Sequence, residues 1–317
     1  MQSNSQAPVL LRIPGFFPGQ QGVPGSDSPF GIRVKPRALP IFVDAGHTNA
    51  SDANDGTNPD APKATIGSAV GAVTEPGSQI LVMPGAYVED VVTPDSVVGP
   101  NYCEIVGIGV AGGSPSWAST GAATVALTIN ALGWRVSGIR FLGQATASCV
   151  VLQNVADDVA NFTQIVGNHF YGQNTGLSAI DLLGAPNNIL IAQNWIDSFA
   201  AASGIAIRNT SVATADPLFA KIVGNLFQEN DTHIVLDLDK GLLLDNLFEN
   251  GAVIGDVVNI SGGGIGENVV KGNVFPGDYS IVGGYTGGTA DVWLGNFASD
   301  TAEAEVGDNG LTILPPA

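Results

Sequence analysis

Acidic side chains recur at similar places in short apolar runs of the second half of the chain, at Asp181 and Asp237. If these runs are equivalent strands of stacked coils, both carboxylates share one outward column with Arg208 and Asn259, roughly 5 Å from strand to strand. Two carboxylates can serve glycoside hydrolysis, one as the acid and the other as base or nucleophile. Such a column also has a structural explanation, because Arg208 between the two aspartates separates their like charges, and we favour this interpretation.

Oxygen-bearing side chains are also concentrated in one loop, at Asp52, Asn54, Asp55, Asn58 and Asp60. Calcium prefers such ligands, but the loop lacks the glutamate that closes an EF-hand loop. We interpret the loop as a turn, and we expect no bound metal and no cofactor.

The elements that must position these side chains are marked by a repeated phrase of the form Ile-Val-Gly-Asn-x-Phe. Its asparagines, separated by 21 to 31 residues, are Asn168, Asn194, Asn225, Asn246, Asn273 and Asn296. This spacing, with strand-forming residues around each Asn, indicates stacked β-coils. We expect the asparagines to form an internal amide ladder at a coil turn, where they pair backbone groups that the bend leaves open. The phenylalanines of the phrase are then core residues.

The start of the coil has its own signals. Apolar residues at 66, 69, 70 and 73 have helical spacing after Thr65, a candidate N-cap, and an apolar strand follows at 79–83. This block also contains Asp-Gly-Thr at 55–57, Pro-Gly at 84–85, Tyr87 and Glu89. Together with the later repeats, it resembles the pectin-lyase-like right-handed parallel β-helix superfamily.

This resemblance covers about residues 41–300 and implies an all-β fold. We expect a single-stranded right-handed parallel β-helix of about eight or nine coils, with a short N-terminal capping helix and an extended N-terminal arm. The predicted division is an arm at 1–40, the β-helix at 41–300 and a C-terminal tail at 301–317.

The resemblance is poor evidence for activity, because the superfamily includes lyases, hydrolases, phage tailspikes and non-catalytic virion proteins. Asp157, Asp158 and His169 are similar to the carboxylate and Gly-His elements of polygalacturonases, but the Asn-x-Asp and downstream Arg-x-Lys elements are missing. Asp157 and Asp158 therefore join Asp181 and Asp237 only as weak catalytic candidates. Trp117 and Trp134, outside the repeats, are the candidates for a carbohydrate or subunit contact.

Residues 1–40 differ from the rest of the chain. Seven prolines disfavour a helix or a central strand, while the apolar content is too high for a free disordered tail. We predict an extended arm that binds a partner or a neighbouring subunit. Its candidate contact residues are Arg12, Phe16, Phe17, Arg33, Lys35 and Arg37.

The net charge of −18 argues against nucleic acid and anionic membranes as partners. The arm is the exception, with four basic residues and one acidic residue. Two cysteines, Cys103 and Cys149, make no disulfide framework and are expected as buried thiols. The N-terminal sequence contains no signal-peptide pattern, so we expect synthesis in a host cytoplasm.

These observations favour a non-catalytic virion structural protein, either a capsid decoration or cement protein or a short spike. The arm would anchor it to the major capsid protein or another virion protein, and the resemblance implies a homotrimer. The alternative is a tailspike-like, glycan-binding depolymerase, a glycoside hydrolase or lyase that acts on a host surface polysaccharide.

Overall fold

The computed structural model describes residues 40–298 and 304–306, with gaps at 98, 110–112, 156–158, 202, 211–216, 250–257, 261–265, 276–284 and 288–289. These residues belong to one compact unit, 37–317. The predicted arm lies outside the described residues except for Pro40, and the predicted tail except for 304–306. Within the described part, no helix is long and apolar enough to span a membrane.

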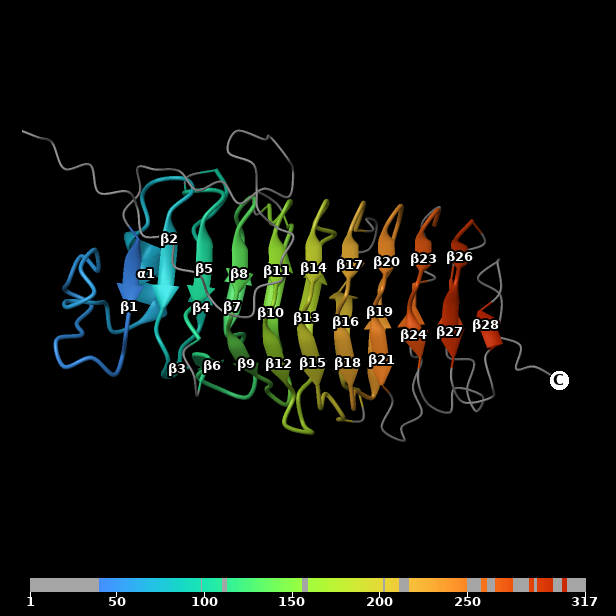
Figure 1. Ribbon diagram of the computed structural model, residues 1–317. Helices are drawn as coiled ribbons and strands as arrows, with labels where there is room; N and C mark the ends of the chain where they lie inside the picture. Colours follow the sequence, from blue (N-terminus) through green and yellow to red (C-terminus); the bar gives the residue numbers. More distant parts are fainter. Residues whose placement is uncertain are drawn as a thin grey trace, which may run out of the picture. The chain divides into compact units, whose positions relative to one another are not determined.

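Three sheets wrap around one core, and each coil passes through sheet 1, sheet 2 and sheet 3 in turn (Figure 1). Sheet 1 contains β1 (Ile41–Val43), β2 (Gln79–Val82), β5 (Glu104–Gly107), β8 (Arg135–Ser137), β11 (Gln164–Val166), β14 (Leu190–Ala192), β17 (Lys221–Val223), β20 (Leu242–Leu244), β23 (Val269–Lys271) and β26 (Val292–Leu294). Sheet 2 contains β3 (Ala86–Val88), β6 (Ser116–Ala118), β9 (Arg140–Leu142), β12 (His169–Tyr171), β15 (Trp195–Asp197), β18 (Leu226–Gln228), β21 (Leu247–Glu249), β24 (Val274–Phe275), β27 (Asn296–Ala298) and β28 (Ala304–Val306). Sheet 3 contains β4 (Val91–Val92), β7 (Leu127–Ile129), β10 (Ser148–Gln153), β13 (Ser178–Leu183), β16 (Ile205–Thr210), β19 (Thr232–Val235), β22 (Val258–Asn259) and β25 (Tyr285–Thr286).

Strand pairing confirms the predicted all-β, parallel β-helical fold. The described strands pair in parallel with the strands of neighbouring coils, and only β27 and β28 pair antiparallel. The sheets hold ten, ten and eight described strands, so the number of levels differs between sheets and slightly from the eight or nine coils expected.

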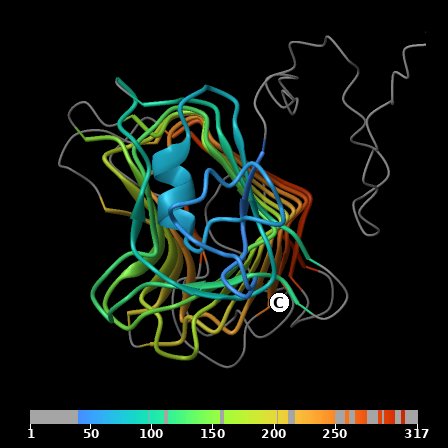
Figure 2. The same ribbon diagram turned by 90° about the vertical axis from the view of Figure 1, so that its left-hand side faces the viewer.

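The predicted capping helix is α1 (Ile66–Ala72), which lies across the open end of the coil (Figure 2). It buries Ile66, Ala69 and Val70, and the Thr65 hydroxyl accepts a hydrogen bond from the Ser68 amide as an N-cap. The Glu89 carboxylate accepts the amides of residues 66 and 67 at 2.8 Å each, and burial raises its pKa. The cap therefore satisfies the first-turn amides that a helix leaves open.

Inward side chains of successive coils stack in columns and form one continuous core. In sheet 2 the rings of Trp117, Phe141 and Phe170 follow one another at centroid distances of 5.4 and 5.0 Å, and Phe227 stacks on Phe248 at 4.7 Å. These rings are buried, and alternation along each strand turns the residues on either side of them outward.

The corner between sheets 1 and 2 is formed by the repeated asparagines. The side-chain amide of each asparagine donates to the Oδ1 atom of the next one, at 2.9 to 3.3 Å, along Asn168, Asn194, Asn225, Asn246, Asn273 and Asn296. The same Oδ1 atoms accept backbone amides, as from Asn194 to Asn225 at 2.9 Å. The residue before each asparagine, such as Gly167 at φ 67°, has a left-handed conformation that lets the chain bend.

The three corners differ in length, and this explains the uneven repeat. From β8 to β24 the asparagine corner has two residues in every coil. The corner between sheets 2 and 3 has three to seven residues from β9 to β19, and that between sheets 3 and 1 has six to ten from β10 to β20. The period therefore varies through two corners and the strands of sheet 3, while the asparagine corner keeps its length.

The Asp-rich loop before α1 is ordered by an internal cation. The Lys63 ammonium donates to the carbonyl oxygens of Asp52 and Asn54, at 3.2 and 2.7 Å, and to the Ser68 hydroxyl at 3.2 Å. The Asp52 carboxylate accepts the Ala64 amide at 3.1 Å and the Thr65 amide at 2.9 Å. The loop oxygens are thus bound to groups of the chain itself, as in a structural turn.

Candidate functional site

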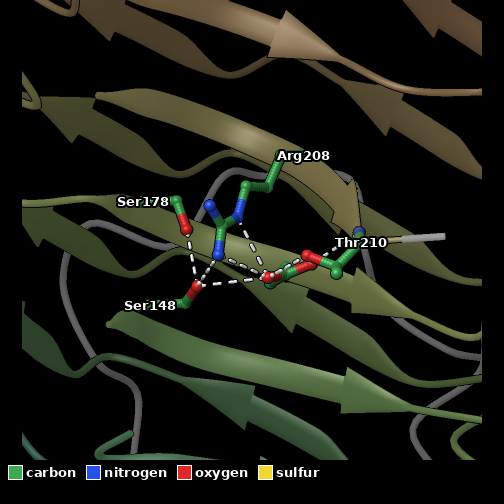
Figure 3. A network of polar contacts seen from close by, with 5 residues as sticks. Ser148, Ser178, Arg208 and Thr210 are labelled. Atoms are coloured by element: carbon green, nitrogen blue, oxygen red, sulfur yellow. Dashed lines mark hydrogen bonds and ion pairs between the residues drawn. The ribbon is translucent and has the colours of Figure 1, made fainter. Parts of the chain in front are cut away.

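Sheet 3 places the predicted Asp181 in a polar network with Ser148, Ser178, Arg208 and Thr210 (Figure 3). We call these five residues the Asp181 network. Asp181 lies opposite Arg208 in the pairing of β13 with β16, and Arg208 donates to its Oδ2 atom from Nε and Nη2 at 2.9 Å each. The Thr210 hydroxyl donates to the same oxygen at 2.8 Å, and the Thr210 amide donates to Oδ1 at 2.9 Å.

This arrangement holds the Asp181 carboxylate as a structural ion pair. Both of its oxygens accept hydrogen bonds, and the residue is buried. The two serine hydroxyls lie 2.6 Å apart, and Ser148 reaches Oδ2 at 3.4 Å. A carboxylate that already accepts from a guanidinium, a hydroxyl and an amide is poorly placed to take a proton from a substrate. The favoured structural interpretation of Asp181 therefore fits this geometry.

Asp237 does not share the column of Asp181, which corrects the predicted register. The structure pairs Arg208 with Val235 and Val235 with Asn259, so Asp237 lies two residues farther along the chain. Its backbone amide donates to Asn209 Oδ1 at 3.0 Å. Because side chains alternate with a period of two, a slip of two residues leaves the inward and outward sets unchanged, and the sequence pattern cannot detect it.

Of the remaining weak catalytic candidates and His169, only His169 lies among the described residues. Asp157 and Asp158 lie outside the described residues. His169 is on β12 of sheet 2, whereas Asp181 is on β13 of sheet 3. Among the described residues, no three His, Cys, Asp or Glu side chains are arranged to hold a metal ion.

Sheet 2 carries a different group of functional side chains on its outer face. Arg140, His169, Tyr171, Trp195 and Asp197 come from the neighbouring strands β9, β12 and β15, and we call them the Trp195 cluster. Arg140, His169 and Trp195 lie opposite one another in the pairing of these strands, and so do Tyr171 and Asp197. They face outward because Phe141, Phe170 and Ile196, the central residues of the same strands, face the core.

The cluster combines exposed aromatic surface with polar groups. The imidazole of His169 stacks on the indole of Trp195, with centroids 4.3 Å apart and planes at 12°. His169 Nε2 lies 3.0 Å from Asp197 Oδ1, within hydrogen-bond distance. The guanidinium carbon of Arg140 lies 5.1 Å from the ring centroid of Tyr171, in cation–π contact.

Trp195 offers the exposed surface of the cluster. Arg140 Nε, by contrast, is buried and has no hydrogen-bond partner among the described residues. Trp195 is 43% exposed, although it lies on a strand of the core-forming coil. A large, exposed ring beside such polar groups is typical of a surface that contacts a ligand.

Polar and apolar side chains continue the two columns of the cluster along sheet 2. Gln228 and Glu249 follow Asp197 in one column, and Leu226 and Leu247 follow Trp195 in the other. Beyond the cluster, the outer face therefore presents apolar side chains in one column beside hydrogen-bonding side chains in the other.

The two tryptophans predicted to make a surface contact lie in the core instead. Trp117 and Trp134 are fully buried, and their indole nitrogens donate to the backbone oxygens of Glu89 and Pro100 at 2.9 and 3.0 Å. Trp195 was overlooked because it lies in the loosest copy of the repeat. The signal was present, since the residues on either side of the inward Phe or Ile of each copy must face outward.

Comparison with known proteins supports no assignment beyond the fold. No protein-family model and no curated protein matches the sequence. Similar solved structures include Escherichia coli YbhC, 12% identical over 87% of this chain and 81% of that chain, with a TM-score of 0.47. A pectin methylesterase from Aspergillus niger is 13% identical over 84% of this chain and 87% of that chain, with a TM-score of 0.36.

A complex of XylC with xylose is also similar, at 12% identity over 74% of this chain and a TM-score of 0.44. The chain spans 46% of the XylC chain, less than half its length. At these identities the likeness concerns the fold alone. The phage virion type that the sequence suggested finds no support in these comparisons.

Proposed function

We propose that the protein binds carbohydrate on the outer face of sheet 2, at the Trp195 cluster. The observation that carries this proposal is the exposed indole of Trp195, stacked on His169 beside the Asp197 carboxylate. Binding sites for small polar ligands combine aromatic surface with a few fixed polar groups. A sugar ring offers both matching surfaces, an apolar face of C–H groups and a rim of hydroxyls.

Each side chain of the cluster has a role in this proposal. The Trp195 ring covers the C–H face of one sugar residue. The Asp197 carboxylate, whose side chain is 13% exposed, accepts a hydrogen bond from a sugar hydroxyl at its exposed edge. His169 holds the indole in place by stacking and keeps Asp197 oriented through their 3.0 Å contact. Arg140 donates to a ring or hydroxyl oxygen with N–H groups that the cation–π contact with Tyr171 leaves available.

Tryptophan fluorescence gives a direct test, because Trp195 is the exposed one of the four tryptophans. Trp117, Trp134 and Trp293 are at most 1% exposed. We expect an oligosaccharide that binds on a glycan array to shift the emission to the blue and to protect the indole from iodide quenching. Trp195→Ala should weaken binding by at least about tenfold, or about 1.4 kcal/mol, through loss of stacking.

The matched control is Leu247→Ala, which removes an exposed apolar side chain of the same column two coils away. It should leave the affinity of a short oligosaccharide unchanged. If no glycan binds the intact chain, or if Trp195→Ala binds as tightly as the parent, the proposal is wrong.

A virion structural role is the second candidate, and the composition of residues 1–40 favours it. The arm combines seven prolines with apolar residues and a basic excess in an otherwise acidic chain. The two roles are compatible, since an anchored protein can present a sugar-binding face. Deletion of residues 1–40 tests them separately, because it removes the proposed anchor and leaves the Trp195 cluster intact.

A further inference from the structure

The outer face of sheet 1 is apolar over its last five strands, β14, β17, β20, β23 and β26. Each strand has three residues, and the buried central one leaves the first and third facing outward. Of these ten outward positions, eight are apolar and two are Lys221 and Lys271. We call this surface the sheet 1 face.

None of these ten positions holds an acidic residue, although the chain has 29 acidic and only 11 basic residues. Apolar side chains instead follow one another from coil to coil, as Val223 to Leu244 and Val269 to Val292. Val292 and Leu294, at its end, are 41% and 42% exposed. Contiguous exposed apolar patches of this kind mark interaction sites.

We propose that the sheet 1 face is where a second copy of this chain docks. Its charge favours this partner over others. Two copies carrying net charges of −18 repel each other, and contact through the face without acidic residues keeps their carboxylates farthest apart. A basic partner would be drawn to the acidic surfaces elsewhere, and a highly acidic partner would meet only two lysines here.

The dimensions also suit self-association. Five strands at a spacing of about 4.8 Å, each of three residues, give an apolar patch roughly 24 Å by 10 Å. The other five strands of sheet 1 extend the same face to roughly 48 Å, with outward Gln79, Glu104, Arg135 and Gln164 as a polar rim. The strands of the whole face cover about 480 Å², somewhat more than half of the roughly 800 Å² that each partner contributes to a standard interface, and the flanking turns would have to contribute the rest.

Sedimentation velocity of the full chain over a wide range of concentrations tests the proposal. We expect a mass of at least two copies, and the measured mass gives their number. Leu244→Glu, at the centre of the face, should raise the dissociation constant by at least about tenfold, because it places a carboxylate in the apolar core of the interface. Leu294→Glu is the second variant, and its exposed position makes misfolding an unlikely cause of dissociation.

Leu247→Glu is the matched control, since it changes the same residue type in the same coil beyond the asparagine corner, on sheet 2. It should assemble like the parent, and circular dichroism should show the same fold for all variants. The proposal is overturned if the parent is monomeric at every concentration, if both sheet 1 variants assemble normally, or if Leu247→Glu dissociates the copies equally. None of these outcomes depends on carbohydrate binding.

Discussion

His233 is a titratable residue that the core holds in its neutral form. It lies between the rings of Phe227 and Phe248, at centroid distances of 5.6 and 5.5 Å, and it is 1% exposed. Its Nδ1 atom lies 3.2 Å from the Asn230 amide nitrogen, whereas Nε2 has no hydrogen-bond partner among the described residues. Burial lowers the pKa of His233 to about 3.

This environment predicts a loss of stability in mild acid. The folded-state pKa of His233 is below the unfolded value of about 6.5, so the unfolded chain binds a proton first as the pH falls. Its contribution to the unfolding free energy should be complete above pH 6.5. It should then fall by about 1.4 kcal/mol per pH unit between about pH 6.5 and 3. Denaturant unfolding at successive pH values measures this slope.

His233→Leu separates this effect from the titration of the carboxylates, which the variant retains. The difference in unfolding free energy between parent and variant should change steadily below pH 6.5 and stay constant above it. A constant difference from pH 7 to pH 4 would contradict the buried neutral imidazole.

At the residue scale, the outward positions of the Trp195 cluster could be predicted from the sequence, but the sequence did not mark these residues as a site. Alternation around the inward Phe170 and Ile196 is enough to place His169, Tyr171 and Trp195 outward. Their mutual stacking depends on which strands are neighbours, and that follows only from the folded coil. Trp117 shows the opposite error, because its strand is outside the recognisable repeat and its inward position could not be identified.

At the scale of the element, the asparagine corner is a continuous, buried hydrogen-bond network that runs from coil to coil. The Asn225 amide donates to Ile191 O and to Asn246 Oδ1 at 3.0 Å each, and its Oδ1 accepts two hydrogen bonds from Asn194. All of these groups are buried, so none can turn to water when a partner is removed.

Asn225→Ala should therefore lower the unfolding free energy by roughly 3 kcal/mol, since it leaves several buried donors and acceptors unpaired. It should leave the affinity of the Trp195 cluster unchanged. Thermal or denaturant unfolding measures the cost, with Asn58→Ala, an exposed loop asparagine, as the control. An unchanged melting temperature for Asn225→Ala would show that the ladder does not stabilise the coil.

Strand positions and core faces followed from the sequence, because β-branched residues alternate around each asparagine. The register of sheet 3 did not follow, as Asp237 shows. In the corner that leads from sheet 2 into sheet 3, the connection from β18 to β19 has three residues, whereas the connection from β15 to β16 in the preceding coil has seven. A corner of variable length shifts a strand by any number of residues, and the period-two pattern excludes only odd shifts.

At the scale of the whole molecule, the excess of negative charge opposes compaction. The net charge of −18 is spread over a chain with only 11 basic residues, and the described part has few ion pairs, such as Asp181 with Arg208. Mutual repulsion of the carboxylates therefore lowers the stability of the folded state at low salt.

We expect the melting temperature to rise by roughly 3 °C when sodium chloride is increased from about 10 mM to about 150 mM at neutral pH. The rise should level off as the Debye length falls to about 8 Å. Repetition near the sequence pI of about 4.1 is the control, since the net charge vanishes there and the salt effect should shrink. A melting temperature that falls with salt at neutral pH would mean that attractive ion pairs dominate.

The unequal corners of the coil divide the surface into regions with different tolerance for change. The two-residue asparagine corner cannot accept an insertion without breaking the amide ladder. The other two corners already vary from three to ten residues between neighbouring coils, without interrupting the pairing of the sheets. Foreign peptides could therefore be grafted at those corners, at a regular spacing of about 4.8 Å per level. The molecule thus offers a scaffold on which loops are displayed in rows while the strands beneath stay unaltered.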